Sequence, residues 1–267
     1  MPEQSAINRE AASRSFNSVP ADYDTYRPSY PRELVDSLIE LTGIPPAGKI
    51  LEVGAGTGKA TLLFAERGFS IVCIEPGANL AAVAARNLGA FPGVQFEISR
   101  FEDWPETASW FDLVLSAQAF HWVSKEVGYA KAARALKSNG SLALFWNMYP
   151  GFEGQLAAEL DDLYREIAPG LGSPLSAVDE AIRQRIGEIE ASGCFGPVTV
   201  KRFPWSMHYT TSQYQGLLNT YSDHLLLPAA TRQRLSAAIG EAIEKHGGSI
   251  ERPYVAVLYV AQKLPHQ

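Results

Sequence analysis

The stretch Ile50-Leu-Glu-Val-Gly-Ala-Gly-Thr-Gly-Lys-Ala-Thr61 decides the fold of this chain. Its first part continues an apolar run from Lys49 and predicts a buried strand, and its end opens a helical pattern that extends to Arg67. The alternating glycines between them let the backbone turn tightly and approach a ligand. The N–H groups at the start of the helix suit a polar or anionic ligand. The stretch therefore predicts a strand, a ligand-binding loop and a helix.

The glycine spacing and a later carboxylate indicate the kind of ligand. Gly54, Gly56 and Gly58 form the pattern G-x-G-x-G rather than the G-x-G-x-x-G of dinucleotide sites, which disfavours a plain NAD site. Glu75 ends the next predicted strand, Ser70 to Ile74, at the distance where an acidic residue meets a ribose diol in doubly wound folds. Together these features predict a nucleoside ligand.

Strand and helix patterns alternate from Ile50 to Trp146. Alternation of this kind implies a parallel, doubly wound sheet of the α/β class. Further strands are expected at residues 94–98, 112–116 and 141–146, and further helices at residues 79–87 and 124–136. Before the first strand, Pro31 opens a helix with one apolar stripe.

The alternation stops after Asn147. Apolar spacing predicts helices over residues 156–167 and 178–189, a strand over 198–209, a helix over 229–246 and a last strand over 254–262. The box Ser212-x-x-Gln215 is expected to start one more helix. These helices interrupt the order of a simple doubly wound sheet.

Composition restricts the class of protein and its partners. A chain of 267 residues with 46% hydrophobic content can bury a sizeable core. The net charge of -6 and the lack of a Lys/Arg tract argue against a nucleic-acid surface. Cys73 and Cys194 fit neither a metal spacing nor a disulfide framework, so we expect packing roles and no metal. The charged N-terminus and the absence of a long apolar run predict a cytoplasmic protein without a membrane partner.

Four segments follow one another at characteristic spacing: Glu52–Gly58, Ile74–Gly77, Phe111–Gln118 and Leu136–Leu144. They resemble the first motif, the ribose-binding turn, the fourth strand and the entry to the fifth strand of the class I S-adenosylmethionine-dependent methyltransferases. The resemblance covers about half of the chain. Two further segments, Tyr26–Pro31 and Ala119–Trp122, resemble the small-molecule branch that includes the trans-aconitate methyltransferases.

The resemblance implies a Rossmann-like, mostly parallel sheet of seven strands whose last two strands pair antiparallel at one edge, with helical cap insertions in the C-terminal half. We expect residues 1–45 to form a segment and helix that cover the donor site, and residues 46–150 to form the S-adenosylmethionine-binding core. Residues 151–267 would supply a helical cap over the substrate region and the last two strands. All three parts would belong to one domain.

The same resemblance places the donor. Many members carry Asp beside the adenine after the third strand, but this chain has Arg100 there, so Phe101 with Glu102 or Asp103 is expected to contact adenine instead. The planar guanidinium of Arg27 presents N–H groups whose geometry matches the donor carboxylate. The full set expected to bind the donor is Tyr26, Arg27, Glu52, Gly54, Ala55, Gly56, Thr57, Gly58, Glu75, Pro76, Arg100, Phe101, Glu102, Ser116, Ala117 and Gln118.

The acceptor is expected beyond the fourth strand, where His121 could act as a general base or position the acceptor. A carboxylate acceptor would need no base, whereas a hydroxyl would. The residues expected at the substrate are His121, Trp122, Trp146, Asn147 and Tyr221. An acidic acceptor would favour a cationic pocket built from Arg27, Arg252 or His224. We therefore expect a small molecule as the partner, and we expect the protein to be a monomer or a homodimer.

Three alternatives remain open from the sequence. A nicotinamide-dependent oxidoreductase would share the strand, loop and helix, although its glycine spacing differs. An RNA methyltransferase would keep the donor fold. A regulatory protein could bind the donor without turnover, since this chemistry needs no signature catalytic residue.

Overall fold

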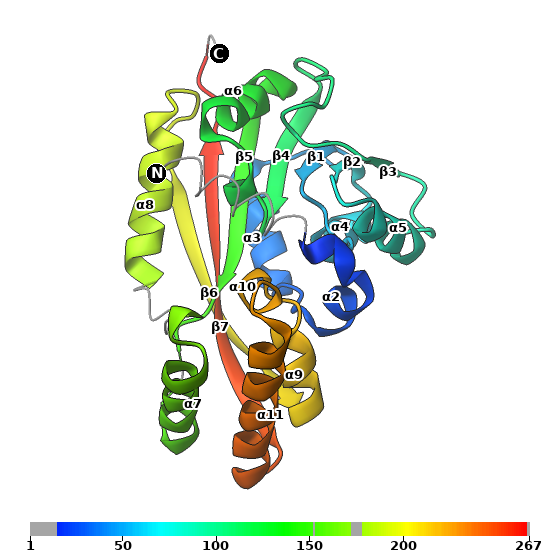
Figure 1. The fold of residues 1–267 in the computed structure, drawn as a ribbon. Coiled ribbons are helices and arrows are strands. Elements are labelled where there is room, and N and C mark those ends of the chain that lie inside the picture. Colours follow the sequence, from blue (N-terminus) through cyan, green and yellow to red (C-terminus); the bar gives the residue numbers. More distant parts are fainter. Residues whose placement is uncertain (1–14, 152, 172–177, 266–267) are drawn as a thin grey trace. The chain divides into compact units, whose positions relative to one another are not determined.

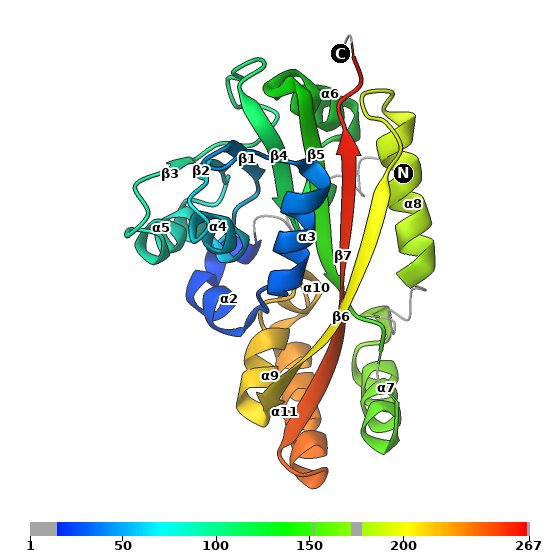
Figure 2. The ribbon, with the colours of Figure 1, turned by 180° about the vertical axis from the view of Figure 1, so that it is seen from behind.

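The computed structural model describes residues 15–151, 153–171 and 178–265 (Figures 1 and 2). The strands in these ranges form one sheet in the order β3-β2-β1-β4-β5-β7-β6. Neighbours from β3 to β5 pair in parallel, and β7 pairs antiparallel with β5, which confirms the predicted α/β fold. The bounds are β1 Lys49–Val53, β2 Ser70–Ile74, β3 Val94–Glu97, β4 Phe111–Ala117, β5 Leu136–Met148, β6 Thr199–Thr210 and β7 Ser249–Gln262.

The central strands form because their residues are apolar on both faces. Ile50, Leu51, Leu113 and Leu115 are fully buried, as expected for parallel strands that carry helices on both sides. Helix α3, Arg32–Thr42, and helix α6, Lys125–Ala135, both pack on β5 and lie on opposite faces of the sheet (Figures 1 and 2). The helices α4, Lys59–Ala65, and α5, Ala78–Asn87, complete the alternation.

The chain divides into two compact units. Unit 1 takes the described residues within Met1–Pro28, Tyr149–Val178 and Pro204–Tyr254, and unit 2 takes those within Ser29–Met148, Asp179–Phe203 and Val255–Gln267. Unit 2 holds β1 to β5 and the residues of the glycine loop. The three-part division expected from the sequence stays a prediction.

Unit 1 has its own apolar core. The helices α2 Pro20–Tyr26, α7 Gln155–Ile167, α9 Thr211–Leu218 and α11 Ala229–Lys245 pack around Leu217, Ile239 and Ile243, which are fully buried. A Cβ on Gly216 would lie 2.4 Å from the ring of Tyr26, so this glycine lets α2 approach α9 closely. Unit 1 also contains the short helix α10, Ser222–Leu225.

The structure differs locally from the sequence analysis at two helices, and β5 and β7 each begin five residues before the expected strands. The capping box of α9 is Thr210 with Gln213, not Ser212 with Gln215, because β6 runs to Thr210 and the chain turns into the helix directly. Helix α2 was not predicted, although Pro20 occupies its first turn, a position that proline favours. In the described ranges no helix is both long and apolar enough to cross a membrane.

The remaining helices of the described ranges are α8, Val178–Ala191, and three short 3-10 helices: Phe16–Ser18, Phe120–Trp122 and Pro169–Leu171. The second of these follows β4 directly, and it holds two of the residues that the sequence assigns to the acceptor.

Candidate functional site

The loop after β1 has the backbone that its glycines predict. Gly54, Gly56 and Gly58 adopt φ values of 75°, 59° and 85°, in the left-handed region that glycine tolerates. A Cβ on Gly54 would lie 2.3 Å from the Cβ of Ala119, so the loop is held against the chain that leaves β4. The glycine at this position therefore sets how closely the ends of β1 and β4 approach.

Glu75 ties this loop to the end of β2. Its Oε2 accepts the N–H of Gly56 and its Oε1 accepts the N–H of Gly77, each at 2.8 Å. The side chain is 6% exposed. Burial raises the pKa of Glu75, and the two backbone hydrogen bonds oppose that shift. The carboxylate therefore holds two turns in place, and each oxygen keeps lone pairs that can accept ribose hydroxyls.

Two buried oxygen atoms of the same segment have no hydrogen-bond partner. Glu52 Oε1 and Thr57 Oγ1 are both inaccessible and unpartnered, and buried polar atoms of this kind commonly mark a ligand or water position. Burial raises the pKa of Glu52 to about 8, with a hydrogen bond from Thr61 opposing the shift and the nearby Glu75 adding to it. Glu52 is therefore mostly neutral at pH 7, and a cationic ligand beside it would favour the ionised form.

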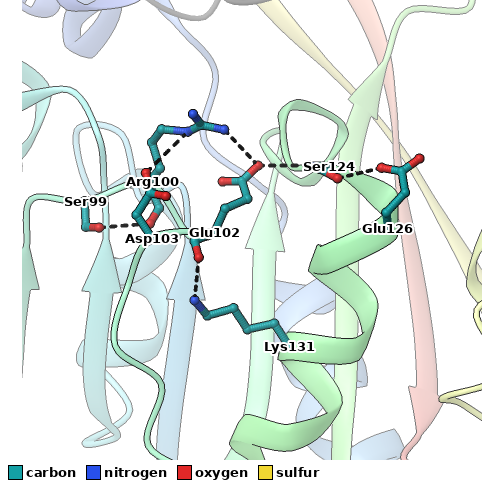
Figure 3. Close-up of polar contacts among 7 residues, drawn as sticks. All are labelled: Ser99, Arg100, Glu102, Asp103, Ser124, Glu126 and Lys131. Atoms are coloured by element: carbon teal, nitrogen blue, oxygen red, sulfur yellow. Dashed lines mark hydrogen bonds and ion pairs between the residues drawn. The ribbon is translucent and has the colours of Figure 1, made fainter.

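The loop after β3 is held by its main chain (Figure 3). Lys131 on α6 donates from Nζ to the carbonyl oxygens of Glu102, at 2.8 Å, and Trp104. Glu102 Oε1 accepts the N–H of Ser124 at 2.9 Å and lies 3.4 Å from Arg100 Nη2 (Figure 3). The loop is thus fixed by two carbonyl contacts and one carboxylate contact.

The residues expected at adenine differ in how far they are buried. The Arg100 side chain is 59% exposed and pairs with Glu102 and Asp103 at the surface. The Phe101 ring is buried and stacks on Trp104 with centroids 6.2 Å apart. Arg100 therefore lies outside the packed part of this loop, whereas Phe101 and Glu102 are fixed within it.

The chain that leaves β4 carries an unusual backbone conformation. Gln118 has φ 58° although it is not glycine. Its backbone N–H donates to the carbonyl oxygen of Phe145 at 2.9 Å. Such strained residues cluster at functional sites because the surrounding structure must hold them. Ser116 is fully buried, and its hydroxyl donates to the carbonyl of Val53 at 2.6 Å. The hydroxyl of Ser116 thus joins β4 to β1, and Ala117 is buried beside it.

His121 and Trp146 meet at the ends of β4 and β5. Trp146 Nε1 donates to His121 Nδ1 at 3.2 Å, and the rings of His121 and Trp122 lie with centroids 4.6 Å apart. Because the indole N–H can only donate, Nδ1 must accept, and neutral His121 carries its proton on Nε2. Asn147, next to Trp146, donates from its side chain to the carbonyl of Ser29 at 2.9 Å.

The remaining predicted residues belong to unit 1. Arg27 donates from Nε to Thr220 Oγ1 at 2.8 Å and from Nη2 to the Thr220 carbonyl at 2.7 Å. Its guanidinium lies 4.1 Å from the ring centroid of Tyr221. The Nε and Nη2 edge of the Arg27 guanidinium is therefore hydrogen-bonded within unit 1. The contacts of Tyr26, Arg27 and Tyr221 with a donor or acceptor stay predictions.

Within unit 2 the structure brings the glycine loop together with Glu75, and His121 together with Trp122 and Trp146. Ala55 is buried in the loop, and Pro76 is exposed in the turn after β2. Lys131 was missed from the sequence. The sequence signal that could have found it is the position of this lysine among the alanines of an otherwise buried helix face, where an ammonium group needs hydrogen-bond acceptors.

Comparison with known proteins identifies the relatives of this chain. Residues 50–140 match a family model described as a methyltransferase domain. An uncharacterized methyltransferase of Schizosaccharomyces pombe is 25% identical over 94% of this chain and 98% of its own length. A Saccharomyces cerevisiae protein named as an S-adenosylmethionine-dependent methyltransferase is 24% identical over 83% of this chain and 82% of its own.

A solved structure shows the same fold. The structure described as a type II methyltransferase from Anaeromyxobacter dehalogenans aligns with a TM-score of 0.62 and 24% identity. The alignment covers 90% of this chain and 100% of that one.

The contact between the glycine loop and Ala119 yields a prediction for Gly54→Ala. We expect this variant to lose about 1–2 kcal/mol for the left-handed alanine and about 1–3 kcal/mol more for the clash, measured by urea denaturation. Gly43→Ala is the matched control, because Gly43 has φ 59° but a Cβ there meets nothing within 4 Å. Equal losses in the two variants would show that the loop does not press on Ala119.

The raised pKa of Glu52 yields a prediction about pH. Between about pH 5 and pH 8 the unfolded carboxyl is ionised while the folded one still binds a proton, so the free energy of unfolding should fall as pH rises. The expected slope is about 1.4 kcal/mol per pH unit, ending above pH 8. Glu52→Gln should remove this decline. Parallel stability curves for wild type and Glu52→Gln at pH 5 to 8 would contradict the assignment.

Proposed function

We propose that this chain is a class I S-adenosylmethionine-dependent methyltransferase that methylates a small molecule bound beside His121. The observation that carries the proposal is the hydrogen bond from Trp146 to His121, which holds an imidazole and an indole at the carboxyl ends of β4 and β5, with the ring of Trp122 beside the imidazole. The net charge of -6 supports a small acceptor over a nucleic acid.

The residues of unit 2 fit the donor. The left-handed glycine loop, the buried Glu75 carboxylate and the unpartnered oxygens of Glu52 and Thr57 form a polar cradle at the carboxyl ends of β1 and β2. Crevices at that edge of a doubly wound sheet are where ligands bind. When bound, the donor supplies an activated methyl group on a sulfonium. We propose that Glu75 holds its ribose, and that Phe101 and Glu102 lie at its adenine.

The protein has little covalent chemistry to perform in this reaction. A lone pair of the acceptor attacks the methyl carbon in line with the carbon–sulfur bond, and the bond electrons leave with sulfur. The chain must therefore align the acceptor and exclude water. Trp122 and Trp146 offer aromatic surface for both tasks, and an indole face attracts a nearby cation by about 0.5–2 kcal/mol.

His121 then positions the acceptor rather than deprotonating it. Its Nδ1 lone pair is engaged by Trp146, and its Nε2 carries the proton, so neutral His121 can donate a hydrogen bond but has no lone pair available for a base role. An acceptor that already carries a nucleophilic lone pair, such as a carboxylate, suits this arrangement. We therefore favour a carboxylic acid over a hydroxyl acceptor.

The comparisons do not favour the nicotinamide-dependent oxidoreductase or the RNA methyltransferase. The resemblance to the trans-aconitate branch, the cytoplasmic location and the choice between monomer and homodimer stay predictions from the sequence. The same holds for the contacts of Asn147 and Tyr221 with the acceptor.

The donor site is tested by calorimetric titration with S-adenosylmethionine and S-adenosylhomocysteine, beside NADH. We expect saturable binding of both adenosyl ligands and a loss of at least about tenfold in affinity for Glu75→Ala, since each hydrogen bond to a charged group contributes about 1.5–3 kcal/mol. Glu75→Gln keeps one oxygen and should lose less.

The control for this titration is Glu97→Ala, at the exposed end of β3, which should bind like wild type. Preferential binding of NADH would overturn the donor assignment. Unchanged binding by Glu75→Ala would mean that this carboxylate does not hold the ribose.

The role of His121 is tested by comparing His121→Gln, which keeps an N–H donor, with His121→Ala. If His121 positions the acceptor, the glutamine variant retains most of the turnover, and the alanine variant loses about tenfold. Release of S-adenosylhomocysteine in the presence of a screened carboxylic acid gives the rate. A general base would instead make both variants slower by about 10²–10⁴-fold and give a rate that rises with pH through the usual imidazole range.

A further inference from the structure

Arg252, near the start of β7, is a buried cation in unit 1. Its side chain sits among four tyrosine rings, and the residue is 7% exposed. The guanidinium carbon lies 3.8 Å from the ring centroid of Tyr149, 5.5 Å from that of Tyr254, 5.7 Å from that of Tyr214 and 5.8 Å from that of Tyr221. Aromatic faces attract a guanidinium, so the rings stabilise its presence there.

No carboxylate neutralises this charge. Within residues 15–151, 153–171 and 178–265, Arg252 forms no ion pair, and its one hydrogen bond runs from Nη1 to the hydroxyl of Tyr214 at 2.8 Å. Its Nε is inaccessible and has no partner. Arg165 and Arg234 of the same unit lie at the surface, and both pair with carboxylates. Arg252 is thus a buried cation without a carboxylate partner in the described part of the chain.

The neighbouring groups cannot supply that counter-charge. Burial raises the pKa of Tyr149, Tyr214 and Tyr254, so these phenols stay neutral at physiological pH. Burial also lowers the pKa of His224, whose Nε2 lies 3.2 Å from the hydroxyl of Tyr164. Neutral rings thus surround one permanent positive charge, and burying such a charge unpaired is unfavourable.

The free donors of Arg252 have a defined geometry. With Nη1 bonded to Tyr214, the edge formed by Nε and Nη2 makes no hydrogen bond to the described residues. Two parallel N–H groups on one guanidinium edge match the two oxygens of a carboxylate. Arg27, by contrast, uses its corresponding edge on Thr220.

We propose that Arg252 binds the carboxylate of a small organic acid through its Nε edge, with the tyrosine rings of unit 1 enclosing the acid. This anion site rests on the geometry of unit 1. The donor carries a carboxylate as well, so the test must separate these two sources.

The test is NMR of protein labelled with [15N-ε]arginine, with the Arg252 Nε–H signal assigned by its loss in Arg252→Lys. The protein, saturated with S-adenosylhomocysteine, is titrated with acetate, succinate and tricarballylate and, as neutral matches, with acetamide and succinamide. We expect a saturable downfield shift of the Arg252 signal with at least one acid and none with the amides. Arg252→Lys should bind that acid at least about tenfold more weakly, because lysine keeps the charge but lacks the fork.

Arg234→Lys, at a surface ion pair in the same unit, is the matched control and should bind the acid like wild type. A shift of Arg252 with S-adenosylhomocysteine alone, and none on adding acids, would assign the site to the donor and overturn the proposal. No shift with any of these compounds would overturn it too. Binding of S-adenosylhomocysteine, measured by calorimetry on the same sample, reports separately on the proposed function.

Discussion

The hydrogen bonds from the backbone of Gly56 and Gly77 to the carboxylate of Glu75 constrain the proposed donor site. They join the loop after β1 to the turn after β2, two segments that pairing of the strands alone leaves free to diverge. The left-handed glycines permit this closure, and Gly54 further brings the loop against Ala119 beyond β4. The carboxylate thus joins the ends of β1 and β2, and Gly54 adds the chain that leaves β4. The buried, unpartnered oxygens of Glu52 and Thr57 belong to the same segment.

The sheet could be predicted because its information is local. Apolar runs, glycine positions and the alternation of strand and helix each depend on a few neighbouring residues, and the order β3-β2-β1-β4-β5-β7-β6 follows from rules that hold for parallel sheets and from the resemblance. The capping box of α9 was misplaced by two residues, because Thr210 and Ser212 are equally good caps in sequence and only the end of β6 decides between them.

The contacts that decide the chemistry of His121 in unit 2 and of Arg252 in unit 1 are mostly long-range and were not predictable. Nothing near His121 in the sequence indicates that Trp146 engages its Nδ1. Only Tyr254 lies near Arg252 in the sequence, and nothing there indicates that three further tyrosines from other parts of the chain surround it. The sequence analysis identified both residues as candidates from their type and approximate position. Whether a histidine can accept a proton, or an arginine lacks a counter-charge, depends on partners that folding brings together.

Lys131 shows how a binding loop can be held without restricting its sequence. Its ammonium contacts the carbonyl oxygens of Glu102 and Trp104, groups that every residue possesses whatever its side chain. Side chains in residues 100–104 are then freer to change during evolution, since the path of the backbone does not depend on all of them. This offers a physical reason why Arg100 can stand where the resembled methyltransferases carry Asp: the path of the loop persists whichever side chain lies there.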